Sequence, residues 1–155
     1  MANDEASPVL RQVGVRDVTA GPDVTIVQPS NVYGATLGEG SFVGPFCEIQ
    51  QGVVIGKRCR IQSHSFICEL VTIGDDCSIA HGVMFVNDLF RGGPARGDRT
   101  RWARTVVADR VSIGSNATIL PVNICSDVVV GAGSVVTKDI TVAGTYAGNP
   151  ARRLN

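Results

Sequence analysis

Large apolar residues recur at every sixth position along most of the chain. The longest uninterrupted series reads Leu37, Val43, Ile49, Ile55, Ile61, Ile67, Ile73, Ile79 and Phe85. An amphipathic helix needs apolar residues at three- and four-residue steps, which a period of six does not supply. Ordinary hairpins would need turn signals at irregular spacing. The pattern predicts an all-β chain that winds so that every sixth side chain points inward.

A second, smaller residue stands two places before each large one. These residues are Ala35, Ser41, Cys47, Val53, Cys59, Ser65, Val71, Cys77 and Val83. We expect them to point inward as well, beside the corners of the coil, where space is short. Glycine follows the large residue at several positions, including Gly38, Gly56 and Gly74.

The six-residue frame extends in both directions. It includes Ile26 and Val32 upstream, and Val107, Ile113, Ile119, Ile124, Val130, Val136 and Val142 downstream, with single-residue slips. Three hexads make one triangular turn, so the chain predicts a parallel β-helix of about six triangular coils. Residues 1–155 form one domain, with an N-terminal arm and first coil at 1–23, a loop at 86–106 and a C-terminal tail at 143–155.

Composition agrees with strands and excludes several functional classes. The 155 residues include 34 Ile plus Val against six Leu, and β-branched side chains suit a pleated surface. Basic and acidic residues number 14 each, so there is no basic excess to attract nucleic acid or an acidic membrane. The sequence has neither a long apolar run nor a signal-peptide pattern, and we expect a cytoplasmic protein with reduced cysteines.

Three motifs resemble the hexapeptide-repeat acyltransferases: the [LIV]-G-x-x-x-x frame, GSNATILP at 114–121, and the ending GAGSVVTKDI…YAGNPARRL. The resemblance implies a left-handed β-helix that assembles as a homotrimer. The stretch 61–90 is similar, more narrowly, to bacterial N-acetyltransferases that act on the 3-amino group of a nucleotide-linked sugar. Ala80 departs from that pattern, since relatives often carry glycine there.

The positions of the polar residues predict a site between subunits. In an eighteen-residue frame Glu69 and Asn87 stack on one corner, whereas His64 and His81 fall on the corner one face away. A face about four residues wide spans roughly 13 Å, too far for both corners of one column to reach one reactive group. A threefold assembly can set one subunit's histidine corner against the next subunit's Asn87.

Amide formation from a thioester needs an unprotonated amine, a donor for the oxyanion and a proton for the departing thiolate. We expect His64, His81 and Asn87 to be catalytic: a histidine orients the amine or accepts its proton, and Asn87 holds the amine or donates to the oxyanion. The alternative is a histidine bonded only to a neighbouring coil, with the thiolate of coenzyme A collecting the proton. Phe90 stands near the place where many acyltransferases of this fold carry a histidine, so their dyad mechanism does not transfer.

The remaining polar residues of the site are assigned to the two substrates. Residues expected to bind the sugar substrate are Glu69, Asp88, Gln62, Glu48 and Arg91. Glu69 can equally be a corner carboxylate without a role, and Asp88 can simply cap the start of the loop. Residues expected to bind acetyl-CoA are Ser115, Ala117, Ala132, Gly133, Ser134, Lys138, Arg152 and Arg153. The alternative for Gly131-Ala132-Gly133 is plain turn geometry of the repeat.

The loop at 86–106 must leave a corner and project, because its polar backbone cannot occupy the narrow core. It carries Arg91, Arg96, Arg99, Arg101 and Arg104 against Asp88 and Asp98. It is either a solvated loop or a flap over a neighbouring subunit that meets phosphates, which suit arginine forks. Trp102 is expected to pack against the neighbouring column or to stack on a base.

The cysteines and histidines do not predict a metal site. Cys47, Cys59 and Cys77 occupy small inward positions, whereas Cys68 and Cys125 are expected to face outward. No Cys-x-x-Cys or Cys/His cluster exists, and a three-histidine zinc site is excluded by the two histidines of the chain.

The function predicted from the sequence is transfer of acetyl from acetyl-CoA to the amine of a nucleotide-linked sugar, best a dTDP-3-amino-3,6-dideoxyhexose, for a surface glycan such as lipopolysaccharide. One alternative keeps the fold but changes a substrate. The acceptor is then a UDP-linked 3-amino uronate or a 4-amino sugar, or the donor carries a longer acyl group. Another is a non-catalytic trimeric assembly module.

Overall fold

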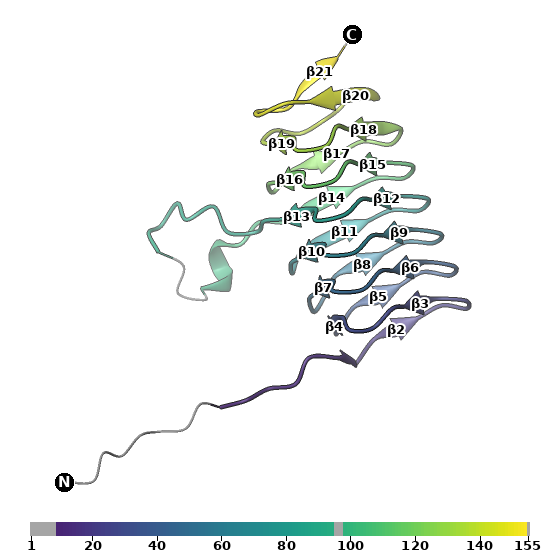
Figure 1. Ribbon diagram of the computed structural model, residues 1–155. Coiled ribbons are helices and arrows are strands. Elements are labelled where there is room, and N and C mark those ends of the chain that lie inside the picture. The colour runs from purple at the N-terminus through teal and green to yellow at the C-terminus, as the bar shows by residue number, and fades with distance from the viewer. Residues whose placement is uncertain (1–8, 95–97, 155) are drawn as a thin grey trace, which may run out of the picture.

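The computed structural model describes residues 9–94 and 98–154, which form a three-sided column of stacked coils (Figure 1). Pairing within each side is parallel and steps one coil at a time, so that Phe66 and Ile67 lie beside Glu48 and Ile49, eighteen residues earlier. The described residues contain no α-helix, only the 3-10 helix η1 (Arg99–Arg101). The predicted all-β column is confirmed, and it is consistent with a left-handed β-helix.

Each side of the column is one sheet. The seven-stranded sheet contains β1 (Val15–Arg16), β4 (Asn31–Tyr33), β7 (Glu48–Ile49), β10 (Phe66–Ile67), β13 (Met84–Phe85), β16 (Thr118–Ile119) and β19 (Val135–Val136). The six-stranded sheet contains β2 (Thr19–Ala20), β5 (Thr36–Leu37), β8 (Val54–Ile55), β11 (Val71–Ile73), β14 (Thr105–Val107) and β17 (Asn123–Ile124). The eight-stranded sheet contains β3 (Thr25–Ile26), β6 (Phe42–Val43), β9 (Arg60–Ile61), β12 (Ser78–Ile79), β15 (Ser112–Ile113), β18 (Val128–Val130), β20 (Gly144–Ala147) and β21 (Arg152–Leu154).

The column has about seven coils, one more than the six predicted. At the N-terminal end β1, β2 and β3 form the first coil, beneath the first strong repeats. At the other end the expected tail is structured, because β20 pairs with β18 and β21 pairs antiparallel with β20. Residues 1–8 and 155 of the predicted arm and tail lie outside the described residues.

The six-residue anchors form the core. All nine residues from Leu37 to Phe85 in the first series are at most 1% exposed, and the smaller residues two places before them are buried too. Val142 is an exception at 52% exposed, so its predicted inward position was wrong. The last coil is two residues shorter than the frame assumes, and Ile140 takes the place above Ile124, to which it forms a bridge.

Polar residues at the small inward positions satisfy backbone groups of the next coil. The hydroxyl of Ser41 donates to the carbonyl of Gly56 at 2.8 Å, and the thiol of Cys59 donates to the carbonyl of Gly74 at 3.0 Å. The hydroxyl of Ser65 donates to the carbonyl of Ala80 at 3.0 Å. Each of these pairs is separated by fifteen residues, so one coil holds the corner of the next. Buried Ser and Cys are therefore tolerated because their donors are paired.

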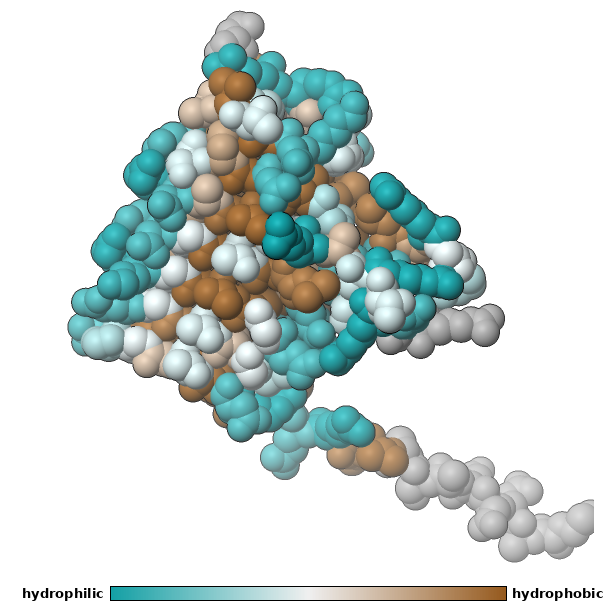
Figure 2. All heavy atoms as spheres, turned by 180° about the vertical axis from the view of Figure 1, so that it is seen from behind, coloured by the Kyte–Doolittle hydropathy of each residue, from teal (hydrophilic) through white to brown (hydrophobic). Residues whose placement is uncertain are grey.

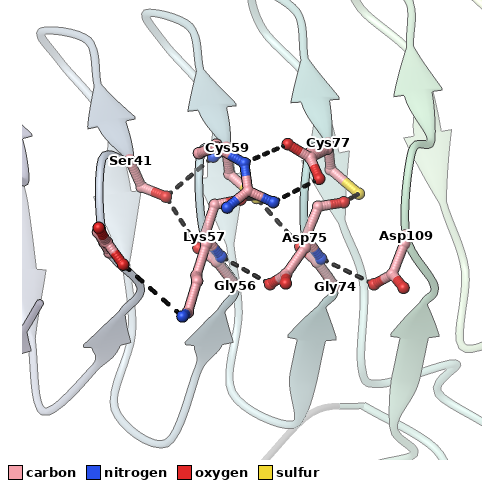
Figure 3. A network of polar contacts seen from close by, with 11 residues as sticks. Ser41, Gly56, Lys57, Cys59, Gly74, Asp75, Cys77 and Asp109 are labelled. Atoms are coloured by element: carbon pink, nitrogen blue, oxygen red, sulfur yellow. Dashed lines mark hydrogen bonds and ion pairs between the residues drawn. The ribbon is translucent and has the colours of Figure 1, made fainter.

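The corner between the six- and eight-stranded sheets is a ladder of charges, which we call the charged corner (Figure 3). Arg58 forms a bidentate ion pair with Asp76 at 2.6 and 2.7 Å, and Arg110 forms one with Asp127 at 2.8 and 2.9 Å. The carboxylate of Asp75 accepts from the backbone N–H of Lys57 at 2.8 Å. These contacts join successive coils, so the corner is a structural seam.

Cys68 is 2% exposed and belongs to the core, so the expectation that it faces outward was wrong. Alternation along a strand fixes the direction of a side chain only within the strand, and Cys68 follows the end of β10, where the chain turns. Burial raises the pKa of its thiol to about 12. Cys125 is half-buried.

The outer faces of the sheets keep apolar side chains uncovered. Seen from behind, apolar residues gather along the middle of the column and polar residues follow its edges (Figure 2). Val54, Met84 and Val129 are 41–46% exposed and lie on three different sheets. Within residues 9–94 and 98–154, no helix has the length and hydropathy to cross a membrane.

Candidate active site

Two corners carry the residues that the sequence singled out, and both border the seven-stranded sheet. The histidine corner joins the eight-stranded sheet to the seven-stranded one, and its turns are Pro45–Phe46, Ser63–His64, His81–Gly82, Ser115–Asn116 and Ala132–Gly133. The loop corner joins the seven-stranded sheet to the six-stranded one, and its turns include Gln51–Gly52 and Glu69–Leu70. The projecting loop, residues 86–104, leaves from the loop corner between β13 and β14 (Figure 1).

The two histidines lie on the histidine corner in successive coils, as predicted. Nδ1 of His81 lies 2.9 Å from the hydroxyl of Ser63, the neighbour of His64. The ring of His64 stacks on Phe46 with centroids 5.1 Å apart and an interplanar angle of 27°. Both histidines are exposed, so their rings are accessible to a ligand or to a second subunit.

Asn87 and Glu69 stack on the loop corner, which confirms their predicted register. The side-chain amide of Asn87 donates to the backbone carbonyl of Glu69 at 3.2 Å. The backbone carbonyl of Asn87 accepts from the N–H of Ala103 at 2.9 Å, which closes the base of the loop. Asn87 is therefore held from both directions and is only partly exposed.

The carboxylate of Glu69 is the centre of a polar network. Its Oε1 accepts from Gln51 at 3.2 Å and pairs with Arg99 at 3.0 Å, and its side chain is 14% exposed. Its backbone N–H donates to Gln50 at 3.2 Å, and Gln50 donates in turn to Glu48 at 3.1 Å. The network links the loop to two successive coils of the column.

This carboxylate cluster perturbs a nearby phenol. Burial raises the pKa of Tyr33, and the negative charges of Glu48 and Glu69 raise it further. The guanidinium of Arg16 lies 4.4 Å from the centre of the Tyr33 ring and acts in the opposite direction. The phenol therefore stays protonated and can donate a hydrogen bond on the face that carries Glu48.

The base of the loop encloses a hollow of about 380 Å³. Asn87, Asp88 and Arg91, all predicted to be near the reaction, line it together. The carboxylate of Asp88 accepts from the N–H of Phe90 at 2.8 Å, so Asp88 does cap the start of the loop. The hollow combines an amide, a carboxylate and a guanidinium, which suits a polar ligand that carries a negative charge.

A second hollow of about 290 Å³ lies against the other side of Asn87 and is mostly aromatic. Phe66, Phe90 and Trp102 line it. Trp102 is half-buried, and the Arg99 guanidinium lies 5.6 Å from its ring. In the described chain Trp102 contributes to this hollow and is not free in solvent. Arg96, one of the loop arginines, lies outside the described residues.

The residues predicted to bind the cofactor divide into two groups and a buried pair. Ser115, Ala132 and Gly133 lie on the histidine corner, C-terminal to the histidines. Lys138, Arg152 and Arg153 line a hollow of about 290 Å³ at the C-terminal end of the column.

The buried pair consists of Ala117 and Ser134, each 0% exposed. Their side chains point into the column and their amides bond to Gly114 and Gly131 within the turns, at 3.3 Å each. Neither residue can contact a cofactor with its side chain in this structure, because both positions belong to the small inward series.

The structure does not bring the two corners together within one chain. The histidine corner and the loop corner lie along opposite edges of the seven-stranded sheet, whose outer face carries Glu48, Phe66 and Met84 between them. Gln62, also predicted at the site, lies beside the histidine corner and lines a shallow hollow on the eight-stranded sheet with Ser78 and Ser112.

Sequence reasoning missed several residues of the polar network. Gln51 stands eighteen residues before Glu69, a spacing that was available as a signal and was not used. Arg99 was named only as one of several loop arginines, and nothing in its spacing pointed to Glu69. Among the described residues no group of three or more His, Cys, Asp and Glu side chains is placed to hold a metal ion.

Comparison with known proteins identifies the repeat. The family described as "Bacterial transferase hexapeptide (six repeats)" matches residues 34–69, and "Hexapeptide repeat of succinyl-transferase" matches residues 104–138. The bifunctional protein GlmU of Acidithiobacillus ferrooxidans is 30% identical over 151 residues, which cover 90% of this chain and 33% of GlmU. GlmU of Limosilactobacillus fermentum is 38% identical over 122 residues, covering 78% and 24%. The chain thus spans about a third or less of the length of these curated relatives.

Solved structures with a similar architecture include acetyltransferases. A hexapeptide-repeat acetyltransferase from Vibrio cholerae, complexed with acetyl coenzyme A, is 29% identical with a TM-score of 0.65, covering 80% of this chain and 71% of its own. The acetyltransferase domain of PglB from Neisseria gonorrhoeae is 25% identical with a TM-score of 0.66, covering 88% and 57%. The N-acyltransferase AntD from Bacillus cereus has a TM-score of 0.75 at 21% identity, covering 89% and 81%, and bears on the fold alone. The two repeat matches and the three-sided column show that the chain carries the hexapeptide-repeat fold that these proteins share.

Proposed function

We propose that the protein is a homotrimeric, acyl-CoA-dependent sugar N-acyltransferase whose active sites lie between subunits. The acceptor we propose is the 3-amino group of a nucleotide-linked 3-amino-3,6-dideoxyhexose, best the dTDP-linked form, and the donor is acetyl-CoA. The observation that carries the proposal is the division of polar residues between two corners. His64 and His81 follow one edge of the seven-stranded sheet, and Asn87 with Glu69 follows the other.

The trimer is proposed because one chain supplies only half of a site at each corner. A threefold axis lets the histidine corner of one subunit face the Asn87 corner of the next. The uncovered apolar positions on the sheets, such as Met84 beside the loop, favour such packing.

The proposed reaction is direct attack of the sugar amine on the thioester carbonyl. The new C–N bond forms while the carbonyl oxygen takes negative charge, and collapse of this intermediate breaks the C–S bond. The amine nitrogen loses one proton, which a histidine or the departing thiolate accepts, so products are an amide and coenzyme A. Asn87 donates to the oxyanion or holds the amine through its side-chain amide, which its contact with Glu69 already orients.

Acyl-CoA as donor is supported by the Vibrio cholerae neighbour, which was solved with acetyl coenzyme A. On this chain the half-buried Ser115 and the exposed Ala132 and Gly133 offer small side chains beside the histidines for the pantetheine. Lys138, Arg152 and Arg153 surround a hollow at the C-terminal end, where three cations suit the phosphates. The donor would then run along the column from its C-terminal end toward His81.

The acceptor rests on the motif at 61–90 and on the polar loop corner. The hollow at Asn87, Asp88 and Arg91 offers donors and acceptors for sugar hydroxyls. Assaying thiol release from acetyl-CoA across dTDP- and UDP-linked 3-amino and 4-amino sugars tests this acceptor directly. Turnover restricted to dTDP-linked 3-amino sugars supports the proposal, and a preference for a UDP-linked uronate would replace the acceptor.

The shared site has its own test. His64→Ala and Asn87→Ala subunits are prepared separately and then mixed under conditions that exchange subunits. If both single variants are inactive, mixed trimers should regain turnover, because one junction then combines two intact halves. No recovery in verified mixed trimers would contradict a site built by two subunits.

The second candidate is a non-catalytic trimeric assembly module. It is favoured only by the regular column itself, which needs no ligand to fold. Calorimetry with coenzyme A separates the two, since an assembly module has no reason to bind it at millimolar concentration.

A further inference from the structure

Phe46 places a large apolar side chain in an exposed turn of the histidine corner. Its φ is +59°, in the left-handed region, which is uncommon for a residue with a bulky side chain. On the other coils the same turn position is taken by His64 at φ +63°, Gly82 at +67°, Asn116 at +58° and Gly133 at +67°. Leu70 at φ +70° and Phe90 at +54° share this backbone at other turns, so the feature of Phe46 that needs a role is its exposed ring, which stacks on His64.

Packing within the chain does not account for the ring. Phe46 is 57% exposed, and the inward position of its turn is filled by its neighbour Cys47, which is 2% exposed. The one aromatic contact of the ring among the described residues is the stack on His64, at 5.1 Å. The two rings therefore form a flat, accessible aromatic surface on the histidine corner, which we call the Phe46–His64 stack.

The place of the stack along the column decides which substrate can reach it. From the N-terminal to the C-terminal end, the histidine corner presents Phe46, His64, His81 and then the turns at 115–116 and 132–133. The proposed donor occupies the C-terminal turns and brings its acyl group to the histidines. The acceptor amine must meet it there, so the rest of the acceptor extends toward Phe46.

We propose that the Phe46–His64 stack binds the nucleobase of the nucleotide-linked acceptor, an inference that rests on the proposed function. Of the parts of such an acceptor, the sugar is polar and the diphosphate is anionic, and only the base is a planar aromatic group that matches the exposed ring. Stacking on an aromatic side chain accepts any base, so Phe46 sets affinity for the nucleotide and leaves the choice between thymine and uracil to other contacts.

The test uses calorimetry on the full-length protein, with dTDP and coenzyme A as separate probes. Phe46→Asn removes the ring and places a residue that favours the left-handed backbone. We expect about 5- to 150-fold weaker dTDP binding, the range for loss of one base–aromatic stack, with unchanged affinity for coenzyme A. The midpoint of thermal unfolding should stay at or above that of the wild type. Phe46→Tyr keeps a ring and should retain dTDP binding.

Each other outcome overturns the inference in a recognisable way. Wild-type affinity for dTDP in Phe46→Asn would show that the ring does not touch the base. Loss of the trimer in sedimentation of Phe46→Asn would assign the ring to a contact with a second copy of the chain. Wild-type protein that binds coenzyme A but not dTDP would overturn the base site and leave the acyl-CoA chemistry standing. Wild-type protein that binds neither would overturn the proposed function itself.

Discussion

Arg99 reaches from the projecting loop to the carboxylate of Glu69, at 3.0 Å, while the side chain of Asn87 is bonded to the carbonyl of the same Glu69. One residue of the column therefore holds the loop where it leaves and where it returns. The segment between Asp98 and Trp102 is ordered by its own contacts, since Asp98 accepts from the N–H of Thr100 at 3.1 Å. The loop has a defined path on this side.

Arg99→Gln should loosen the loop without unfolding the column. Removing one partly exposed ion pair costs about 0–1 kcal/mol of stability. Trp102 is the only tryptophan of the chain and lies 5.6 Å from the Arg99 guanidinium, so its fluorescence should change. In the proposed reaction the KM for the acceptor should rise more than kcat falls. Arg104→Gln, at an exposed loop arginine, is the matched control, and equal effects of the two variants would assign the change to loop charge alone.

Ile55→Ala should be far more damaging than Val54→Ala, although the two residues are adjacent on β8. Ile55 is 1% exposed and Val54 is 41% exposed. Deleting a buried isoleucine to alanine costs about 2–5 kcal/mol through lost transfer energy and the cavity left behind. Urea unfolding at fixed protein concentration measures the difference. Similar losses for both variants would mean that the outer face of the six-stranded sheet is covered by another subunit.

Gly56→Ala tests the close approach of successive coils at the charged corner. A Cβ at residue 56 would lie 2.6 Å from the carbonyl carbon and oxygen of Gly74, and it would also meet the carboxylate of Asp75. Overpacking of this kind costs about 1–3 kcal/mol. Gly14→Ala is the control, because no heavy atom lies within 4 Å of a Cβ there. A melting temperature unchanged by Gly56→Ala would show that the coils can separate freely at this corner.

The Arg58–Asp76 pair makes stability depend on acid pH. The hydrogen bonds and charge of Arg58 lower the pKa of Asp76 below its ordinary value of 3.8, so the folded state holds the charged form more firmly than the unfolded chain. The contribution is complete above the ordinary value and is lost as pH falls through the lowered one. Thermal melts from pH 7 to pH 3 should show a shallower acid loss for Asp76→Asn. In an Arg58→Gln background the same substitution should have no further effect, and a full effect there would contradict the pairing.

Cysteine reactivity should separate Cys125 from the other thiols. The pKa of Cys68 is about 12, so almost no thiolate exists at pH 8, and the side chain is buried. A thiol reagent should label the half-buried Cys125 first and the other four only in denaturant. Cys125→Ser should remove the fast phase. Rapid native labelling of Cys68, located by mass spectrometry, would contradict its burial.

The column could be predicted because each coil contacts only its neighbours, so a one-dimensional pattern specifies the three-dimensional fold. Arithmetic on eighteen residues also placed His81 on the same corner as His64, one coil later, and Asn87 above Glu69. The pattern failed where a coil is shorter than eighteen residues or where the chain leaves a strand. Val142 is exposed because the last coil is short, and Cys68 is buried because it lies in a turn, where strand alternation no longer applies.

The contacts of the site were less predictable than its register. Arg99 pairs with Glu69 because the loop passes Glu69 on its way back to the column. Residues 98–102 do not follow the six-residue repeat, so the sequence pattern could not predict this contact. Phe46 was passed over because a sequence pattern does not show that its turn needs a positive φ. The requirement for a positive φ could have been inferred from the equivalent turns further along the chain, which contain Gly82 and Gly133.

The last strand of the column runs against all the others in its sheet. β21 is antiparallel to β20, and it presents Arg152 and Arg153, both exposed, along the open edge. A parallel coil of another molecule finds no matching register there, and two such positively charged ends repel each other. A stack of coils has no intrinsic length, so the reversal at β21 marks the point where the parallel pairing of the eight-stranded sheet stops.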